Sequence, residues 1–174
     1  GNEFKNSGDL IYMIGLTKSE LGGSEYFDMI QYKGGFVPHL DLEKSKKSYF
    51  VFHQLLKKYL VTGAISIQNG GLITAINRSC MNYGASISLN NVKHSCRTIE
   101  QILFSESCGR ILFSANKSNQ TLIENIFAEN AFGDYAVIGE VEFDGVFSVK
   151  NENILISYSS QDIQKNYKQN YFGF

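Results

Sequence analysis

The chain has 174 residues and a formal net charge of -1, from 16 basic and 17 acidic side chains. This balance argues against nucleic-acid binding and against a polybasic membrane patch, because both need a surplus of Lys and Arg. Hydrophobic residues make up 43% of the sequence, which excludes a disordered tail and predicts one compact domain.

In chain order, apolar periodicity and turn residues predict about seven strands and five or six helices. They are a strand over 9–16, a short helix after Ser24, a helix over 41–60, a strand over 61–67, a helix over 72–83, a strand over 85–89, a helix over 99–104, a strand over 110–114, a helix over 119–129, strands over 135–141, 146–150 and 154–158, and a last helix capped by Ser160. Asp144 and Gly145 predict a hairpin between two of these strands. The mixed order predicts an α+β fold, with helices layered on both faces of a mixed sheet.

Two of the predicted helices carry an apolar stripe that can face a core. In the helix over 41–60, which Asp41 can cap, the stripe consists of Leu42, Tyr49, Phe52, Leu56 and Tyr59. In the helix over 72–83 it consists of Leu72, Ile76 and Cys80. Both helices are therefore expected to pack on the sheet.

No metal or cofactor motif is present in the sequence. There is no Walker loop, no dinucleotide-binding glycine pattern and no Cys-x-x-Cys pair. The cysteines and histidines are dispersed: Cys80, Cys96, Cys108, His39, His53 and His94. These spacings predict reduced thiols in a cytoplasmic protein and no metal site.

Two glycine pairs each lie between a predicted strand and a predicted helix. The first junction holds Gly22 and Gly23, followed by Ser24 and Glu25, and the second is Asn69-Gly70-Gly71. Glycine lets the backbone approach a ligand, and the first amides of a helix can bind a phosphate. The alternatives are a simple turn at the first junction and close packing of helix against sheet at the second.

A third polar turn follows the predicted helix over 99–104. It contains Ser105, Glu106 and Arg110, which can orient a polar ligand or, as an alternative, can include an ion pair between Glu106 and Arg110. Three such turns on one sheet predict an anion-binding edge. Phosphate or a nucleotide is the expected ligand.

In this order the segments resemble the C-terminal domain of phosphoribosylformylglycinamidine synthase, whose superfamily includes aminoimidazole ribonucleotide synthetase. The resemblance lies in residues 8–17, 20–26, 61–72, 103–110 and 136–141, and it spans nearly the whole chain. It implies that residues 1–174 form a single C-terminal domain of a larger synthase, with the fold of the aminoimidazole ribonucleotide synthetase C-terminal domain.

The second glycine turn departs from the family pattern. The family usually has His-Asp and then Ser-Asp before the two glycines, whereas this chain has Ile65-Ser66 and Gln68-Asn69. A carboxylate able to hold magnesium is thus missing, together with an imidazole. No metal ligand is therefore assigned to this chain.

The resemblance implies an ATP-dependent carbon–nitrogen ligase of purine biosynthesis. The full enzyme converts formylglycinamide ribonucleotide and glutamine-derived ammonia into the amidine. ATP and magnesium would be held mainly by a preceding ATP-binding domain, and the ammonia would come from a glutaminase subunit. This chain, with no intrinsic cofactor and no catalytic residue of its own assigned, would supply one wall of the cleft for the phosphorylated ribonucleotide.

Two other functions remain open at this stage. The chain can be the equivalent domain of another superfamily member, such as aminoimidazole ribonucleotide synthetase, or a non-catalytic assembly domain of the same fold. As a domain of the synthase, the isolated chain is expected to be inactive. An apolar face separated from its partner domain could also make the chain a homodimer.

Overall fold

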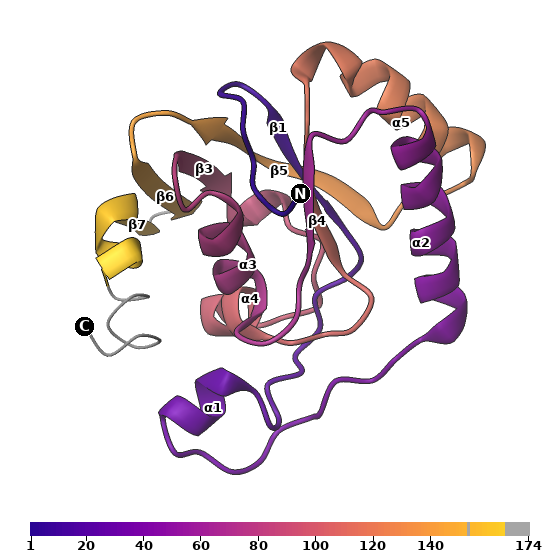
Figure 1. Ribbon diagram of the computed structural model, residues 1–174. Helices are drawn as coiled ribbons and strands as arrows, with labels where there is room; N and C mark the ends of the chain where they lie inside the picture. The colour runs from indigo at the N-terminus through magenta and orange to yellow at the C-terminus, as the bar shows by residue number, and fades with distance from the viewer. Residues whose placement is uncertain (153, 166–174) are drawn as a thin grey trace.

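The computed structural model describes residues 1–152 and 154–165 of the chain. A seven-stranded mixed sheet forms its centre, with the strand order β2-β4-β1-β5-β3-β6-β7 (Figure 1). The strands are β1 (Leu10–Ile14), β2 (Gly63–Ser66), β3 (Gly84–Ser88), β4 (Ile111–Ala115), β5 (Tyr135–Glu142), β6 (Val146–Asn151) and β7 (Ile154–Ser159). The helices are α1 (Glu25–Met29), α2 (Leu42–Lys57), α3 (Gly71–Ser79), α4 (Ile99–Phe104) and α5 (Gln120–Glu129), with short 3-10 turns at Leu89–Asn91 and Lys117–Asn119.

Strand β1 lies in the middle of the sheet and is buried on both faces. Its side chains alternate, as the pleat of a strand requires. Ile11 and Met13 join the core under α3 and α4, while Leu10, Tyr12 and Ile14 join the core under α2 and α5. The sheet is therefore covered by a helical layer on each face (Figure 1), which confirms the layered α+β prediction.

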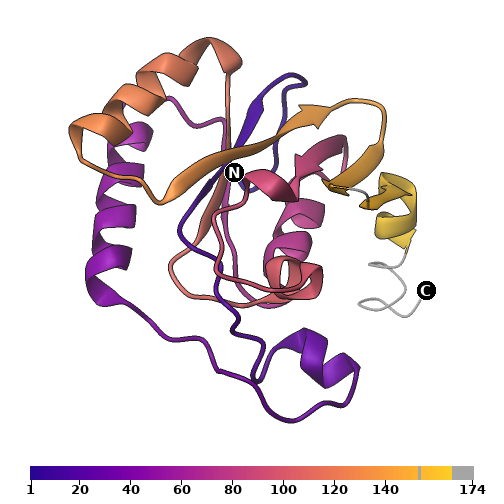
Figure 2. The same ribbon diagram turned by 180° about the vertical axis from the view of Figure 1, so that it is seen from behind.

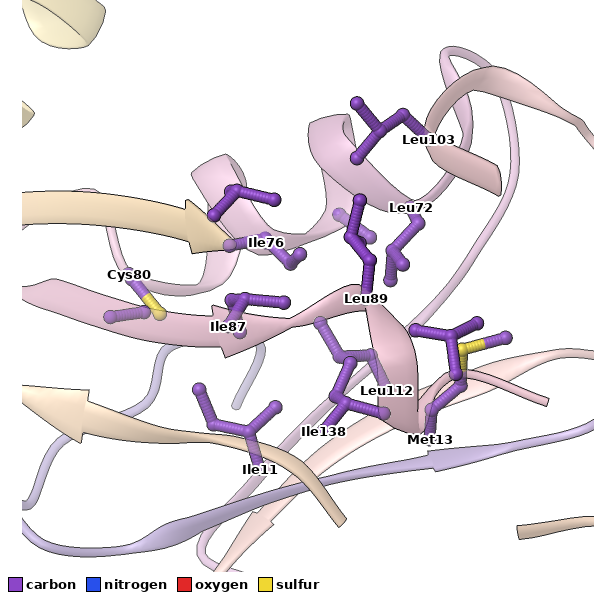
Figure 3. Packing of buried hydrophobic residues seen from close by; sticks show 14 of the residues in the cluster. Ile11, Met13, Leu72, Ile76, Cys80, Ile87, Leu89, Leu103, Leu112 and Ile138 are labelled. Atoms are coloured by element: carbon purple, nitrogen blue, oxygen red, sulfur yellow. The ribbon is translucent and has the colours of Figure 1, made fainter. Parts of the chain in front are cut away.

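Helix α3 packs on the sheet through the stripe that its sequence predicts. Leu72, Ile76 and Cys80 are fully buried, and Figure 3 shows them above Ile87 and Leu112 of the sheet. Full burial of one such aliphatic side chain stabilises the fold by roughly 1.5–3 kcal/mol. The predicted face of this helix is confirmed.

Helix α2 presents a different face to the sheet from the one that its sequence predicts. Its buried residues are Ser45, Ser48, Val51 and Leu55. In the predicted stripe Leu42 is 71% exposed and Tyr59 is 92% exposed, and only Phe52 packs against the core. A Cβ on Gly109 would lie 2.6 Å from the Ser45 hydroxyl oxygen, so the small serines lie where the helix closely approaches this turn. The apolar stripe is therefore at the surface, and the prediction for this helix is wrong.

The hairpin predicted around Asp144 and Gly145 is also wrong. Strand β3 lies between β5 and β6: Ala85 is paired with Val141 of β5 on one side and with Phe147 of β6 on the other. The Asp144 carboxylate accepts a hydrogen bond from the Val146 amide at 2.9 Å, so the Asp-Gly pair does turn the chain. Strand β3, from earlier in the chain, occupies the position beside β5 that a hairpin would give to β6. Turn residues alone do not predict this insertion.

The last described helix begins one residue away from its predicted cap. Residues 160–165 are helical, and the Ser159 hydroxyl accepts a hydrogen bond from the Asp162 amide at 3.1 Å. Ser159 is therefore the capping residue, and Ser160 is buried instead. Among the described residues, no helix is long and apolar enough to cross a bilayer.

Residues 25–41, which we call the arm, project from the body of the molecule. Figures 1 and 2 show α1 and the segment after it extending away from the sheet. The arm is tied at its base, where the Gly22 amide donates to the Phe36 carbonyl at 2.8 Å. Ring stacking of Tyr26 on Phe104, with centroids 4.5 Å apart, joins α1 to α4.

Candidate functional site

The first glycine junction connects the body to the arm. Gly23 has a φ of +72°, and the buried Ser24 caps α1 by accepting from the Phe27 amide at 3.2 Å. A Cβ on Gly22 would lie 2.8 Å from the Gly35 carbonyl oxygen, so glycine allows the chain that leads into the arm to touch the returning segment at Gly35 and Phe36. Gly22 therefore shapes the arm, whereas Gly23 is exposed at the surface.

The second junction places the start of α3 beside α4. Gly70 and Gly71 have φ values of +77° and +70°, which favour glycine. A Cβ on Gly71 would lie 2.5 Å from the Leu103 carbonyl oxygen. Both glycines are therefore required by the local backbone, which supports the close-packing alternative at this junction.

One carboxylate joins all three predicted turns. The Glu106 Oε1 atom accepts hydrogen bonds from the Glu25 amide and from the Gly70 amide, each at 2.9 Å. The Asn69 side-chain amide donates to the Glu25 carboxylate at 3.2 Å, which adds a second link between the first two junctions. Helix beginnings attract negative charge, and here the charge comes from the chain itself. Segments that are far apart in sequence therefore meet at Glu106.

Five backbone amides of these junctions already have acceptors within the chain. Gly22 donates to Phe36, Ser24 to Leu21, and Gly71 to Gln68. Glu25 and Gly70 donate to Glu106. A phosphate could reach the last two amides only by replacing the Glu106 carboxylate. Phosphate binding by these residues therefore remains a prediction, with this displacement as its condition.

Ser105 and Arg110 stabilise the third turn from inside. The Arg110 guanidinium is 1% exposed and donates to the Ser105 and Ser107 carbonyls and to the Thr17 hydroxyl. Burial lowers the pKa of Arg110 to about 10. The buried Ser105 hydroxyl accepts from the Glu20 amide at 3.3 Å. The described residues contain no ion pair between Glu106 and Arg110, so that alternative is wrong, and each of the three guanidinium nitrogens of Arg110 donates within the chain.

Seven of the ten predicted site residues line two separate hollows, whereas Gly70, Gly71 and Ser105 line neither of them. A cleft of about 440 Å³ lies between the arm, α2 and the third turn; it is lined by Pro38, Leu40, Tyr49, Ser66, Ile67, Gln68, Asn69, Glu106, Cys108, Gly109 and Arg110. A second hollow, of about 590 Å³, lies within the arm, and Gly22, Gly23, Ser24 and Glu25 contribute to its wall. The two helix beginnings thus meet at Glu106, but they do not open into one common hollow.

Eight residues of the cleft are not among the predicted site residues, and three of them, Pro38, Leu40 and Tyr49, lie outside the predicted turns. Pro38 and Leu40 come from the arm, and Tyr49 comes from the exposed stripe of α2. No local motif marks them, because they reach the cleft only through the path of the arm. Tyr49 reaches the cleft because it lies at the surface and not in the core, and this position becomes evident only in the tertiary fold.

The cleft does not have the donor set that magnesium prefers. Its second turn offers Ser66, Gln68 and Asn69 in place of carboxylates, and the Glu106 carboxylate is already hydrogen bonded. Among the described residues no three His, Cys, Asp or Glu side chains gather into a metal site. We therefore derive no chemistry from a metal bound to this chain.

Comparison with known proteins identifies relatives of the chain. A protein-family model, that of the AIR synthase related protein, C-terminal domain, matches residues 6–150. Phosphoribosylformylglycinamidine synthase subunit PurL of Methanococcus aeolicus is 30% identical over 164 residues, and that of Thermococcus sibiricus is 33% identical over 159 residues. These matches cover 92% and 89% of this chain but 22% of each relative. The chain thus spans about a fifth of the length of these curated relatives.

Solved structures share the fold of this chain. Thermotoga maritima PurL complexed with FGAR superimposes with a TM-score of 0.80 at 22% identity, over 92% of this chain and 28% of that one. Hydrogenase maturation protein HypE, at 12% identity, has a TM-score of 0.65 over 91% of this chain and 55% of its own. Both likenesses concern the fold alone. From the family match, which covers most of its length, the chain belongs to the family of the AIR synthase related protein, C-terminal domain, and it is similar to about a fifth of PurL.

Proposed function

We propose that this chain is the C-terminal domain of a phosphoribosylformylglycinamidine synthase and acts in de novo purine biosynthesis in the cytoplasm. In this role it forms one wall of a cleft for a phosphorylated ribonucleotide. A preceding ATP-binding domain of the same enzyme forms the other wall, and a glutaminase subunit supplies ammonia. The curated relatives that are named PurL, and the structure of PurL complexed with FGAR, support this proposal.

The observation that carries the proposal is the convergence at Glu106. The three segments that resemble the synthase family lie up to 81 residues apart in sequence, yet they are joined by hydrogen bonds to one carboxylate. A polar centre of this kind beside a cleft of about 440 Å³ is typical of a binding site.

The chemistry requires positioning more than it requires a nucleophile on this chain. When bound to the enzyme, ATP activates the amide oxygen of the substrate, and phosphoryl transfer depends mainly on alignment and charge neutralisation. Gln68 and Asn69 supply exposed amide groups at the cleft, which can hydrogen bond to a ribose hydroxyl or a phosphate oxygen. Glu106 fixes the positions of both helix beginnings, and Arg110 keeps the third turn rigid from below.

The function is tested by genetic complementation. A full-length protein that contains this chain should restore growth of a bacterial strain that lacks phosphoribosylformylglycinamidine synthase on medium without purines. Removal of residues 1–174 from that protein should abolish growth. The purified chain alone should form no amidine from ATP, ammonia and formylglycinamide ribonucleotide. Amidine formation by the chain alone, or growth supported by the truncated protein, contradicts the proposal.

A non-catalytic assembly role is the second candidate. It is favoured by the internal Glu106 carboxylate, which already occupies the Glu25 and Gly70 amides. Calorimetry with inorganic phosphate and with ribose 5-phosphate separates the two roles. Binding that is lost in Gln68→Ala or Asn69→Ala, at the wall of the cleft, supports the cleft function. Absence of binding at millimolar ligand, together with a stable oligomer, supports assembly.

A further inference from the structure

The outward surface of α2 has the residue spacing of a coiled-coil seam. Leu42, Lys46, Tyr49, His53 and Leu56 follow one another in alternating steps of four and three residues, and all five are exposed. We call these five residues the outer seam. Alternating steps of this kind place side chains in one row along a helix, where a second helix can pack.

The outer seam carries three large apolar side chains that the described part of the chain leaves uncovered, next to Lys46 and His53. Leu42 is 71% exposed, Tyr49 is 53% exposed and Leu56 is 44% exposed. Phe50, next to the seam, is 59% exposed. Large apolar side chains gathered on one surface mark an interaction site more often than isolated ones do. Whatever covers this surface comes from outside residues 1–152 and 154–165.

The charges beside the seam point to a second copy of the chain as the occupant. Glu43 and Lys57 lie on the same side of α2, each seven residues from Phe50. If two α2 helices pack antiparallel about a two-fold axis at Phe50, each Glu43 meets Lys57 of the other copy. The two helix dipoles are then also opposed, which is favourable. We propose that this chain forms a homodimer through antiparallel pairing of its α2 helices.

A parallel pair is disfavoured by the same charges. It would place Lys46 beside Lys46 and Lys57 beside Lys57 of the second copy, and like charges at such positions destabilise a pair. In the antiparallel arrangement Lys46 instead lies opposite residues 53–56 of the second copy, which carry no Lys or Arg.

The surface beside Phe50 can also accept an aromatic ring. A shallow, mainly apolar hollow of about 430 Å³ is lined by Glu43, Lys44, Lys46, Lys47 and Phe50. Near the two-fold axis, Phe50 of the second copy reaches this hollow, and the lysine stems surround its ring. The aromatic anchor and its receptor therefore lie on one self-complementary surface, as a two-fold dimer requires.

Sedimentation equilibrium of the 174-residue chain tests the dimer. We expect a dimer with a dissociation constant on the order of 10 µM, and a monomer after Phe50→Glu. Leu122→Glu, at a 44% exposed leucine of α5, is the matched control and should remain dimeric. A wild-type chain that stays monomeric up to about 300 µM overturns the proposal, as does equal dissociation by the control variant.

A charge exchange tests the antiparallel geometry. Glu43→Lys and Lys57→Glu should each weaken the dimer by about tenfold, because each creates two like-charged contacts across the two-fold axis. The variant that carries both changes should recover wild-type affinity to within about threefold. Additive weakening in this double variant refutes antiparallel pairing. The dimer shares only Tyr49 with the cleft of the proposed ligase function. Dimerisation and complementation are measured separately, so the failure of one is distinguishable from the failure of the other.

Discussion

Helices α2 and α3 both carry an apolar stripe, but only α3 buries it. The α3 stripe fills the core above Ile87 and Leu112, as Figure 3 shows. On α2 the buried side combines Ser45 and Ser48 with Val51 and Leu55, and Leu42, Tyr49 and Leu56 face outward. Periodicity thus reveals that a helix has an apolar side, whereas the partner of that side depends on what approaches the helix in three dimensions.

Truncation in the two stripes should give the largest contrast. Ile76→Ala should lower the free energy of unfolding by about 3 to 4 kcal/mol, because Ile76 is fully buried and its removal leaves a cavity. Leu56→Ala should lower it by less than about 0.5 kcal/mol in the monomer. Urea unfolding at low protein concentration measures both. Similar losses in the two variants would show that the α2 stripe is covered within the monomer.

The glycines of the two junctions provide a second matched pair. Gly71→Ala should lower the free energy of unfolding by about 3 kcal/mol or more, since its Cβ would lie 2.5 Å from the Leu103 carbonyl oxygen and φ is +70°. Gly23 also has a positive φ, but a Cβ there would meet open space. Gly23→Ala should therefore lower the free energy of unfolding by about 1 kcal/mol. Thermal and urea unfolding check this. If Gly23→Ala costs as much as Gly71→Ala, the close approach at α4 is not the cause.

Alkaline pH should weaken the core under α3. Burial raises the pKa of the Cys80 thiol from 9.0 to about 12, so the folded protein retains this proton after the unfolded chain has lost it. The stabilisation from the neutral thiol is complete below pH 9 and is lost as the pH rises toward 12. The decline for one such thiol is at most about 1.4 kcal/mol per pH unit.

Urea unfolding at several pH values, for wild type and Cys80→Ala, measures this contribution. The variant is expected to be less stable at pH 8 but to show a shallower alkaline decline. Tyr158, whose pKa burial raises to about 12, contributes a decline that both proteins share. Equal slopes for the two proteins would exclude Cys80 as a source.

Glu106→Gln should have a small effect on stability and a local effect on dynamics. The amide oxygen can still accept from Glu25 and Gly70, but without the charge the two hydrogen bonds weaken, and the expected loss is about 1 kcal/mol. Hydrogen exchange of these two amides should accelerate together. Glu129→Gln, an exposed carboxylate of α5, is the control and should leave both rates unchanged. Acceleration at only one of the amides would contradict a shared acceptor.

Much of the fold could be predicted from local patterns. The α3 stripe and the capping residues Ser24 and Asp41 follow from side-chain chemistry within one turn of chain, and the structure has all three. The glycine pairs marked both junctions, because positive φ and close approach require them. Strand order was not predictable in this way: β3 enters between β5 and β6 from more than fifty residues earlier.

The candidate site was predictable in its parts but not in its assembly. The turns that contain Ser24, Gly70 and Glu106 were recognised separately, and the resemblance to a family joined them. The Glu106 side chain of the third turn accepts hydrogen bonds from the Glu25 and Gly70 amides because the loops bring these segments together. Sequence spacing does not encode that loop geometry. The same reason hides the role of Arg110, whose partners Thr17 and Ser105 become neighbours only after folding.

A single oxygen atom that serves two donors has a thermodynamic consequence. Since Glu106 Oε1 binds the Glu25 and Gly70 amides together, a molecule that competes for either amide must disturb both contacts. The orientation of the arm and the beginning of α3 are thus linked, and linkage is reciprocal. A molecule that changes the orientation of the arm will therefore change, by the same amount, the free energy needed to separate the Glu106 carboxylate from the Gly70 amide.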